Sequence, residues 1–277
     1  MSDWIKVVIQ GLVQGITEFL PISSTGHLLV VGSLLDFGEA MEGTFEIVIQ
    51  LGTLLAILVY FRRELWEQVL QVRSDRAIQS LWLNIIIASI PISVVGFLLV
   101  DFITTTLYSE NRRVPVVAFM LLFGGVIFLW IEKSRIQSQS DGQDQVTSIY
   151  EISRRQALVI GLAQAVALIP GTSRSGASIV GGLLAGLDRA TAAIFSFYLA
   201  IPALGGATLI TLLTSLDELQ EKQLGFLALG ALVAGLAGWV VIGWLLRYLA
   251  SNSFAIFGYY RILAGIVLLA LMAMGLM

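Results

Sequence analysis

Four ionisable residues lie within apolar stretches of the sequence: Glu18, His27, Arg174 and Arg261. Such residues are costly inside a membrane, so each is a candidate for function if the chain is embedded in one. A carboxylate can bind a cation or accept a proton, an imidazole titrates near neutral pH, and a guanidinium matches the oxygens of phosphate. Ser24 lies between Glu18 and His27 and adds a hydroxyl that can attack phosphorus once it is activated.

Gln14 and Glu18 are four residues apart, a spacing that places both side chains on one face of a helix. A carboxylate with an amide oxygen beside it suits a hard divalent cation such as Mg²⁺ or Ca²⁺, because these ions prefer oxygen ligands. Glu18 also suits a general base. The alternative is a structural carboxylate that accepts hydrogen bonds from its own loop.

His27 is the only histidine in the chain and ends the segment PISSTGH, residues 21–27. If the chemistry needs a side chain that titrates near neutrality, no other residue here qualifies. The alternative is a histidine at a helix end that caps carbonyl groups. Its position beside Ser24 and Glu18 favours the catalytic interpretation.

Two clusters of small polar residues, SSTG at 23–26 and GTSRSG at 171–176, each precede an apolar helix. A helix N-terminus offers free N–H groups and a partial positive charge, and both favour phosphate. The residues predicted to bind phosphate are Ser23, Thr25, Gly26, Thr172, Ser173, Ser175 and Gly176, with Arg174 inside the second cluster. The alternative for a single cluster is a tight contact between membrane helices.

Two further polar residues have open interpretations. Gln50, in FEIVIQLG, is either a core amide or a phosphate ligand, and we favour the ligand because Glu46 lies four residues before it. Arg261, in FGYYRILAG, either extends to the membrane interface or pairs with an intramembrane acid.

The composition requires a membrane around these residues. The chain has 277 residues, of which 57% are apolar and 13% charged, about half the charged fraction of a soluble domain. Four uncharged runs, at 81–100, 114–131, 190–216 and 223–246, reach or approach the ~20 residues needed to cross a bilayer. The absence of cysteine excludes thiolate chemistry, and no basic block indicates a nucleic-acid partner.

The sequence contains two copies of one unit. Gly11-Leu12-Val13-Gln14 matches Gly161-Leu162-Ala163-Gln164 at an offset of 150 residues, and Phe45 matches Phe195 at the same offset. Pro21 and Pro170 follow in the two copies, and each has a serine three residues later, Ser24 and Ser173. Each proline and its polar cluster interrupt the motif, which predicts a helical hairpin that enters the membrane and returns.

The predicted fold is an all-α polytopic membrane protein, an inverted repeat with six transmembrane helices and two re-entrant helix pairs. Repeat 1 covers 1–134 with its hairpin at 4–37, a polar cytoplasmic linker covers 135–153, and repeat 2 covers 154–277 with its hairpin at 156–187. The six spans are predicted near 45–61, 81–102, 114–131, 191–214, 224–247 and 256–276. Inverted repeats usually hold a ligand at their junction, and because this is also transporter architecture, a transporter or flippase of a lipid phosphate or small anion is the alternative function.

Loop charges predict the orientation. Four Lys and Arg residues flank the spans on the face of the N-terminus, and ten flank them on the other face, at 62–76, 133–155, 189 and 247. The positive-inside rule makes the second face cytoplasmic, so the first hairpin is expected to open outward.

At these motifs the chain resembles the undecaprenyl-diphosphatase family, also called the bacitracin-resistance proteins. The resemblance covers nearly the whole chain and is strongest at the Gln14–Glu18 motif of form (E/Q)xxxE, at Pro21–His27, at FEIVIQLG and at PGTSRSG. Many relatives have Glu where this chain has Gln14. A second lipid-phosphatase superfamily, the phosphatidic-acid-phosphatase type, has similar short segments, but its chemistry uses two histidines and this chain has one.

The resemblance implies a bacterial cytoplasmic-membrane enzyme that hydrolyses undecaprenyl diphosphate to the monophosphate carrier of cell-wall synthesis, with a divalent cation. It implies that Glu18, Ser24, His27 and Arg174 are active-site residues. We expect Ser24 to attack the terminal phosphorus and His27 to move the proton; attack by His27 or by water stays open. The expected partners are a polyprenyl diphosphate, the bilayer and a second copy of the chain in a homodimer.

Overall fold

The computed structural model describes residues 1–35, 42–140, 145–215 and 221–276, and within these ranges the chain is helical apart from turns and one isolated bridge between Val146 and Leu187. The first half contains α1 (Asp3–Thr17), α2 (Ser24–Leu35), α3 (Glu42–Tyr60), α4 (Arg62–Gln71), α5 (Arg76–Phe102), the π-helical turn η2 (Ile103–Leu107) and α6 (Glu110–Ser140). The second half contains η3 (Ile149–Glu151), α7 (Arg154–Ala165), η4 (Val166–Leu168), α8 (Arg174–Leu184), α9 (Arg189–Ser215), α10 (Glu221–Leu249) and α11 (Ala255–Ala273).

The prediction of an all-α membrane protein is confirmed. Among the described residues, four segments are long and apolar enough to cross a membrane: Arg76–Leu107, Asn111–Ser134, Leu224–Leu249 and Ala255–Ala273. Helices α3 and α9 coincide with the other two predicted spans, and that these also cross, as part of an inverted repeat, stays a prediction. Apolar side chains cover much of the outer surface, such as Phe97 and Leu98 with 82% and 70% of their area exposed, as expected of a chain that faces lipid.

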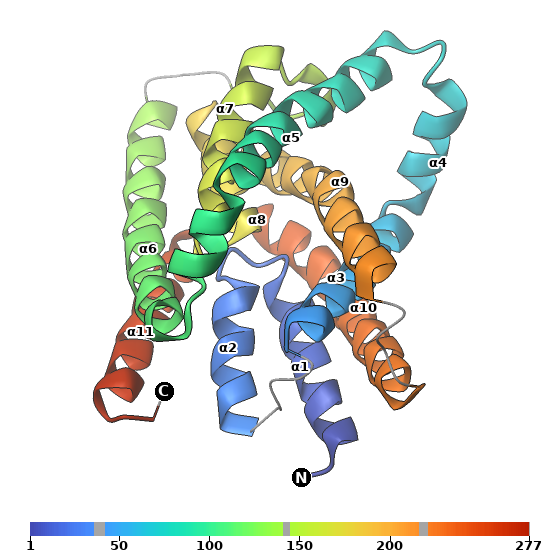
Figure 1. Cartoon of the computed structure of the whole chain (residues 1–277). Coiled ribbons are helices and arrows are strands. Elements are labelled where there is room, and N and C mark those ends of the chain that lie inside the picture. The colour runs from blue at the N-terminus through green and yellow to red at the C-terminus, as the bar shows by residue number, and fades with distance from the viewer. Residues whose placement is uncertain (36–41, 141–144, 216–220, 277) are drawn as a thin grey trace.

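Two helical hairpins meet inside the molecule (Figure 1). The pair α1–α2 occupies the lower part of the view and the pair α7–α8 enters from the upper part, so that their turns lie together near the centre. The two turns are joined directly, because the Ser175 hydroxyl donates to the Leu20 carbonyl over 3.2 Å. Side chains at both turns can therefore act on one ligand.

Glycine allows the helices around the first hairpin to approach closely. A Cβ atom at Gly11 would lie 2.8 Å from the carbonyl oxygen of Gly230 on α10, and one at Gly52 on α3 would overlap the backbone of Ala231. Backbone contact of this kind is usual where membrane helices pack through small residues. Helix α10 thus fixes α1 and α3 in position beside the turn that follows α1.

The predicted linker differs from the observed backbone. Helix α6 continues to Ser140, so the first six residues of the predicted linker 135–153 are helical. The segment KSRIQSQS contains Lys, Arg and Gln, which are good helix formers, and this explains the extension beyond the apolar span. Residues 36–37 of the first predicted hairpin and 141–144 of the linker lie outside the described residues.

Candidate active site

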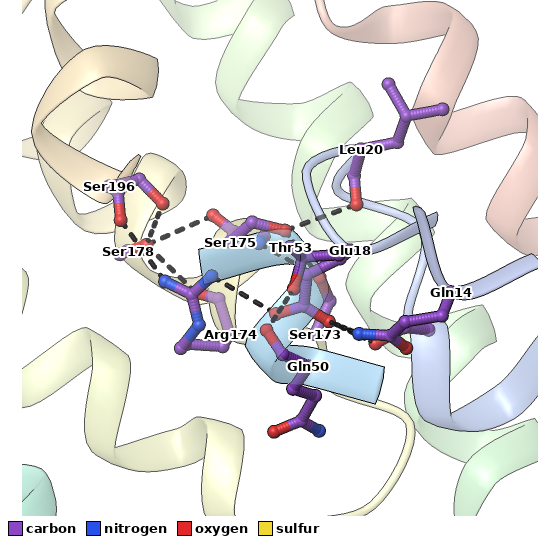
Figure 2. Close-up of polar contacts among 12 residues, drawn as sticks. Gln14, Glu18, Leu20, Gln50, Thr53, Ser173, Arg174, Ser175, Ser178 and Ser196 are labelled. Atoms are coloured by element: carbon purple, nitrogen blue, oxygen red, sulfur yellow. Dashed lines mark hydrogen bonds and ion pairs between the residues drawn. The ribbon is translucent and has the colours of Figure 1, made fainter. Parts of the chain in front are cut away.

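Glu18 is the centre of a polar network that joins both hairpins (Figure 2). It is only 6% exposed and follows the last residue of α1. Its Oε2 atom accepts hydrogen bonds from the Ser24 hydroxyl over 2.7 Å and from the Gln14 amide over 3.1 Å. Its Oε1 atom accepts from Nη2 of Arg174 over 3.2 Å. The carboxylate therefore contacts a hydroxyl from its own hairpin and a guanidinium from the other.

Arg174 is fixed by contacts on both sides of its guanidinium. Nη1 donates to the Ser196 carbonyl on α9 over 3.2 Å, and Nη2 forms the ion pair with Glu18. The Ser196 hydroxyl accepts from Ser178 on α8 over 2.7 Å, so α8 and α9 are joined behind the arginine. These bonds use two of the five guanidinium N–H groups and leave others for an anion.

Helices α2 and α8 begin in the same way. Ser23 and Ser173 both have a φ of 73°, which is strained for residues other than glycine. The hydroxyl of each accepts from the backbone N–H three residues later, Gly26 over 3.3 Å and Gly176 over 3.1 Å. This corrects the predicted alignment of Ser24 with Ser173. The second hairpin has one more residue between proline and serine, so Ser23 corresponds to Ser173, and Ser24 corresponds to Arg174.

A cavity of about 430 Å³ lies between the two helix starts. Its charged groups are Glu18 and Arg174, and its polar wall includes the predicted nucleophile Ser24 and four of the predicted phosphate ligands: Ser23, Thr25, Ser173 and Gln50. Apolar residues of α5, η4 and α9 complete it. The cavity thus combines one carboxylate, one guanidinium and the N-termini of two helices, an arrangement suited to an anion such as phosphate.

The other four predicted phosphate ligands do not line this cavity. Ser175 is buried and joins the two turns, and Gly26 faces a different groove. Thr172 and Gly176 face an apolar pocket beside α6 and α7. Gly26 and Gly176 have no side chain, and the hydroxyl of Ser175 is directed at the Leu20 carbonyl. These four residues support the turns and do not contact the cavity.

His27 also lies outside the cavity, contrary to the expectation that it shares a site with Ser24. Its ring stacks on Tyr260 of α11 at a centroid distance of 5.5 Å, and its Nε2 atom lies 2.6 Å from the Tyr260 hydroxyl. The His27 ring is directed at α11, whereas the hydroxyl of Ser24, on the same helix, is directed at Glu18. His27 lines an apolar groove between α2 and α11.

Arg261, on α11, joins the two turns from outside the cavity. The side chain is 1% exposed, and its guanidinium donates to four carbonyl groups, those of Pro21, Thr172, Gly171 and Met120, over 2.8–3.1 Å. Neither predicted interpretation is correct, because Arg261 reaches no interface and its partners are carbonyl groups. It binds the backbone of both hairpins at once.

The amide nitrogen of Gln14, and not its oxygen, faces Glu18, and the predicted role of the pair in binding a cation stays a prediction. The amide nitrogen donates to the carboxylate, and the amide oxygen is buried without a partner among the described residues. Among the described residues there is also no cluster of three or more His, Cys, Asp or Glu side chains that could hold a metal ion. In this arrangement the Gln14 amide orients Glu18, and the Glu18 carboxylate is the group of the pair that can bind a cation.

Gln50 lines the cavity, but its amide points away from Glu18 (Figure 2). Glu46, which suggested that Gln50 is a ligand, pairs with Arg113 at 3.2 Å and lies outside this cavity. Gln50 can therefore contact a ligand in the cavity only at a distance from the Glu18 carboxylate.

Three polar residues of the site were not predicted. Ser93 and Tyr108 line the cavity, and Ser196 supplies the carbonyl that holds Arg174. Burial raises the pKa of Tyr108, so its phenol stays protonated at neutral pH and can donate a hydrogen bond. Ser93 and Ser196 lie within uncharged runs, where the sequence does not distinguish them from other small helix residues.

The fold and the site define an α-helical membrane protein with a polar cavity, lined by one carboxylate and one guanidinium, at the junction of two helical hairpins. The model of the family described as bacitracin resistance protein BacA matches residues 7–267, and the chain belongs to this family. An undecaprenyl-diphosphatase of Deinococcus radiodurans is 44% identical over 99% of this chain and 97% of its own length. A protein of Paraburkholderia xenovorans named undecaprenyl-diphosphatase 1 is 44% identical over 96% of this chain and 95% of its own length.

Proposed function

We propose that this protein is a membrane phosphatase that hydrolyses undecaprenyl diphosphate to undecaprenyl phosphate and inorganic phosphate. The observation that carries the proposal is the contact of Glu18 with both Ser24 and Arg174 inside one cavity. These two contacts support a reaction in which the Ser24 hydroxyl is the nucleophile, Glu18 accepts its proton and the Arg174 guanidinium binds phosphate. The names of the relatives support the same substrate.

The phosphate groups bind at the two helix starts. The N-termini of α2 and α8 provide positive ends of helix dipoles, and Arg174 provides N–H groups in a planar fork. Arg261 lies behind both turns and has no carboxylate among its four hydrogen-bond partners, so its charge adds to the positive potential of the site. Stabilisation of negative charge is the main task in phosphoryl transfer, and this arrangement performs it.

Ser24 attacks the terminal phosphorus. A bond forms between Ser24 Oγ and phosphorus while the bond from phosphorus to the bridging oxygen breaks, and undecaprenyl phosphate leaves. Glu18 accepts the hydroxyl proton, since its Oε2 atom already lies 2.7 Å from Ser24 Oγ. Water then attacks the phosphorus of the phosphoserine, the bond between phosphorus and Ser24 Oγ breaks, and Glu18 returns its proton to Oγ. Inorganic phosphate leaves, and the serine hydroxyl and the Glu18 carboxylate are restored.

Glu18 therefore replaces His27 as the proposed proton acceptor. The change rests on position, because the Glu18 carboxylate contacts Ser24 directly, whereas His27 is directed at Tyr260. The Gln14 amide and the Arg174 guanidinium both contact the carboxylate and hold it towards Ser24.

A divalent cation fits this site if the diphosphate supplies most of its ligands. Glu18 provides one carboxylate, and Mg²⁺ is usually held by one or two carboxylates together with substrate phosphates and water. When bound, the cation would neutralise charge on the phosphate oxygens. Gln14 would keep its orienting role, because its amide nitrogen faces the carboxylate.

The protein is proposed to lie in the cytoplasmic membrane of a bacterium with the cavity open to the outer face. Loop charges support this orientation, since the face of the N-terminus has four Lys and Arg residues and the other face has ten. The prenyl chain would remain among the apolar helices while the head group enters the cavity.

The test is a phosphate-release assay with purified protein in detergent, undecaprenyl diphosphate and Mg²⁺ or Ca²⁺. We expect many turnovers for the unmodified protein and a fall of at least ~100-fold for Glu18→Gln. Glu46→Gln is the matched control, because it also removes a carboxylate from an ion pair, with Arg113, outside the cavity. Binding of the lipid without release of phosphate would instead support a transporter.

A further inference from the structure

The two ring nitrogens of His27 have different partners. Nδ1 lies 2.7 Å from the carbonyl oxygen of Ser23, and Nε2 lies 2.6 Å from the hydroxyl of Tyr260. A carbonyl can only accept, so Nδ1 must bear the hydrogen. In a neutral imidazole Nε2 is then an acceptor, and the phenol donates to it. The contacts select one tautomer, with the hydrogen on Nδ1.

The carbonyl that His27 holds belongs to the strained turn before Ser24. Ser23 has a φ of 73°, and both Ser23 and Ser24 line the cavity, whereas His27 does not. The conformation at Ser23 decides where α2 begins and hence where the Ser24 hydroxyl points. A group that fixes the Ser23 carbonyl therefore acts on the site through the backbone.

The second hairpin shows why the first needs this support. Ser173 has the same φ of 73°, but the residue four positions later is Ala177, which has no hydrogen-bonding side chain. There, Arg261 binds the carbonyls of the two residues directly before the serine, Gly171 and Thr172. In the first hairpin Arg261 binds only the Pro21 carbonyl, and His27 supplies the further donor.

We propose that His27 is a positioning residue, which holds the Ser23 carbonyl through Nδ1–H while Tyr260 fixes the ring, so that Ser24 stays directed at Glu18. His27 transfers no proton in the reaction. The positioning role of His27 rests on the proposed hydrolysis at Ser24. The tautomer and the contact with Tyr260 do not.

The tautomer can be measured without any assay of activity. Because the chain has a single histidine, protein labelled with ¹⁵N-histidine gives one pair of ring nitrogen signals. We expect a protonated Nδ1 and an unprotonated Nε2 at neutral pH, and Tyr260→Phe should shift the Nε2 signal while Nδ1 stays protonated. An unmodified protein with the hydrogen on Nε2 would overturn the proposal.

Two substitutions of His27 separate positioning from proton transfer. Asparagine places an N–H donor near the position of Nδ1, whereas glutamine places its amide nearer to Nε2. We expect His27→Asn to keep kcat within about tenfold of the unmodified protein, the scale of one weakened hydrogen bond. His27→Gln should lose about 100-fold in kcat, the scale of a reacting group displaced by about 1 Å, with KM changed less than kcat.

The controls use the neighbouring tyrosines. Tyr260→Phe should lower kcat by less than about tenfold, because only the second support of the ring is lost. Tyr259→Phe, at a side chain that is 66% exposed, should leave activity unchanged. Equal losses of about 100-fold in His27→Asn and His27→Gln would contradict positioning and return proton transfer to His27. Absence of phosphate release by the unmodified protein would reject the proposed function, and the tautomer measurement would still decide the contacts of His27.

Discussion

Replacing Arg261 with methionine tests the physical connection between the two hairpins. The substitution keeps an unbranched chain and removes the guanidinium, which leaves four buried carbonyls without this donor. Each lost bond costs about 1 kcal/mol, so the gross loss is about 4 kcal/mol. Release of the buried charge offsets part of this loss. A net loss of about 3 kcal/mol corresponds to a fall in Tm of about 6–12 °C in a chain of this size.

The assay is thermal unfolding of the purified protein in detergent, read by circular dichroism and by phosphate release after heating. Arg261→Lys should lower the Tm only about a quarter as much, because an ammonium group has three donors for the four carbonyls and leaves one of them unpaired. Arg247→Met is the control, since this arginine is exposed at the end of α10. If the Tm of Arg261→Met lay within about 2 °C of the unmodified value, less than 1 kcal/mol on this scale, the reasoning would be refuted.

Three further predictions concern packing and the cation. Gly52→Ala should destabilise the protein by about 3 kcal/mol, because the new Cβ would overlap the backbone of Ala231, whereas Gly206→Ala, where nothing lies within 4 Å, should be neutral or stabilising by up to ~1 kcal/mol. Equal unfolding midpoints for the two variants would contradict this packing. Removal of divalent cations with a chelator should stop phosphate release and added Mg²⁺ should restore it; full activity in the chelator would exclude the proposed cation. Gln14→Glu should lower the Mg²⁺ concentration for half-maximal activity about fivefold or more, because an added charge at ~4 Å is worth about 1 kcal/mol even in water. An unchanged Mg²⁺ dependence would mean that no cation binds beside residue 14.

The helices of the fold are largely predictable from the sequence. Uncharged runs of membrane-spanning length identify the long helices, because residues in a lipid environment must be apolar over a length fixed by the bilayer. The proline and serine clusters identify the turns at Ser23 and Ser173, since both interrupt a helix. The helical continuation to Ser140 was missed because it is polar and depends on helix propensity instead of hydropathy.

The contacts within the site are less predictable, because they depend on helix rotation and on carbonyl groups. The sequence places Glu18, Ser24 and Arg174 near one another through the matched hairpins. It does not determine that His27 faces Tyr260, because the direction of a side chain on α2 depends on where the helix begins. The partners of Arg261 are backbone atoms, which no residue type in the sequence identifies.

The alignment of the two hairpins shows the same limit. The order of residues matches Ser24 with Ser173, but the equal φ angles show that Ser23 is the counterpart of Ser173. One additional residue in the second turn shifts the register, and only the backbone conformation reveals it. The correction has a functional consequence, because it makes Ser24 and Arg174 equivalent in position and both contact Glu18.

The central claim is that one cavity, formed by both hairpins, cleaves the diphosphate. The most direct test measures kcat/KM for undecaprenyl diphosphate in Ser24→Ala, Arg174→Met and the double variant. We expect each single variant to lose at least ~100-fold in kcat/KM. The double variant should lose little more than the more impaired of the two single variants, since the effects of groups that act as a unit are not additive. Activity close to that of the unmodified protein in either single variant would contradict the claim.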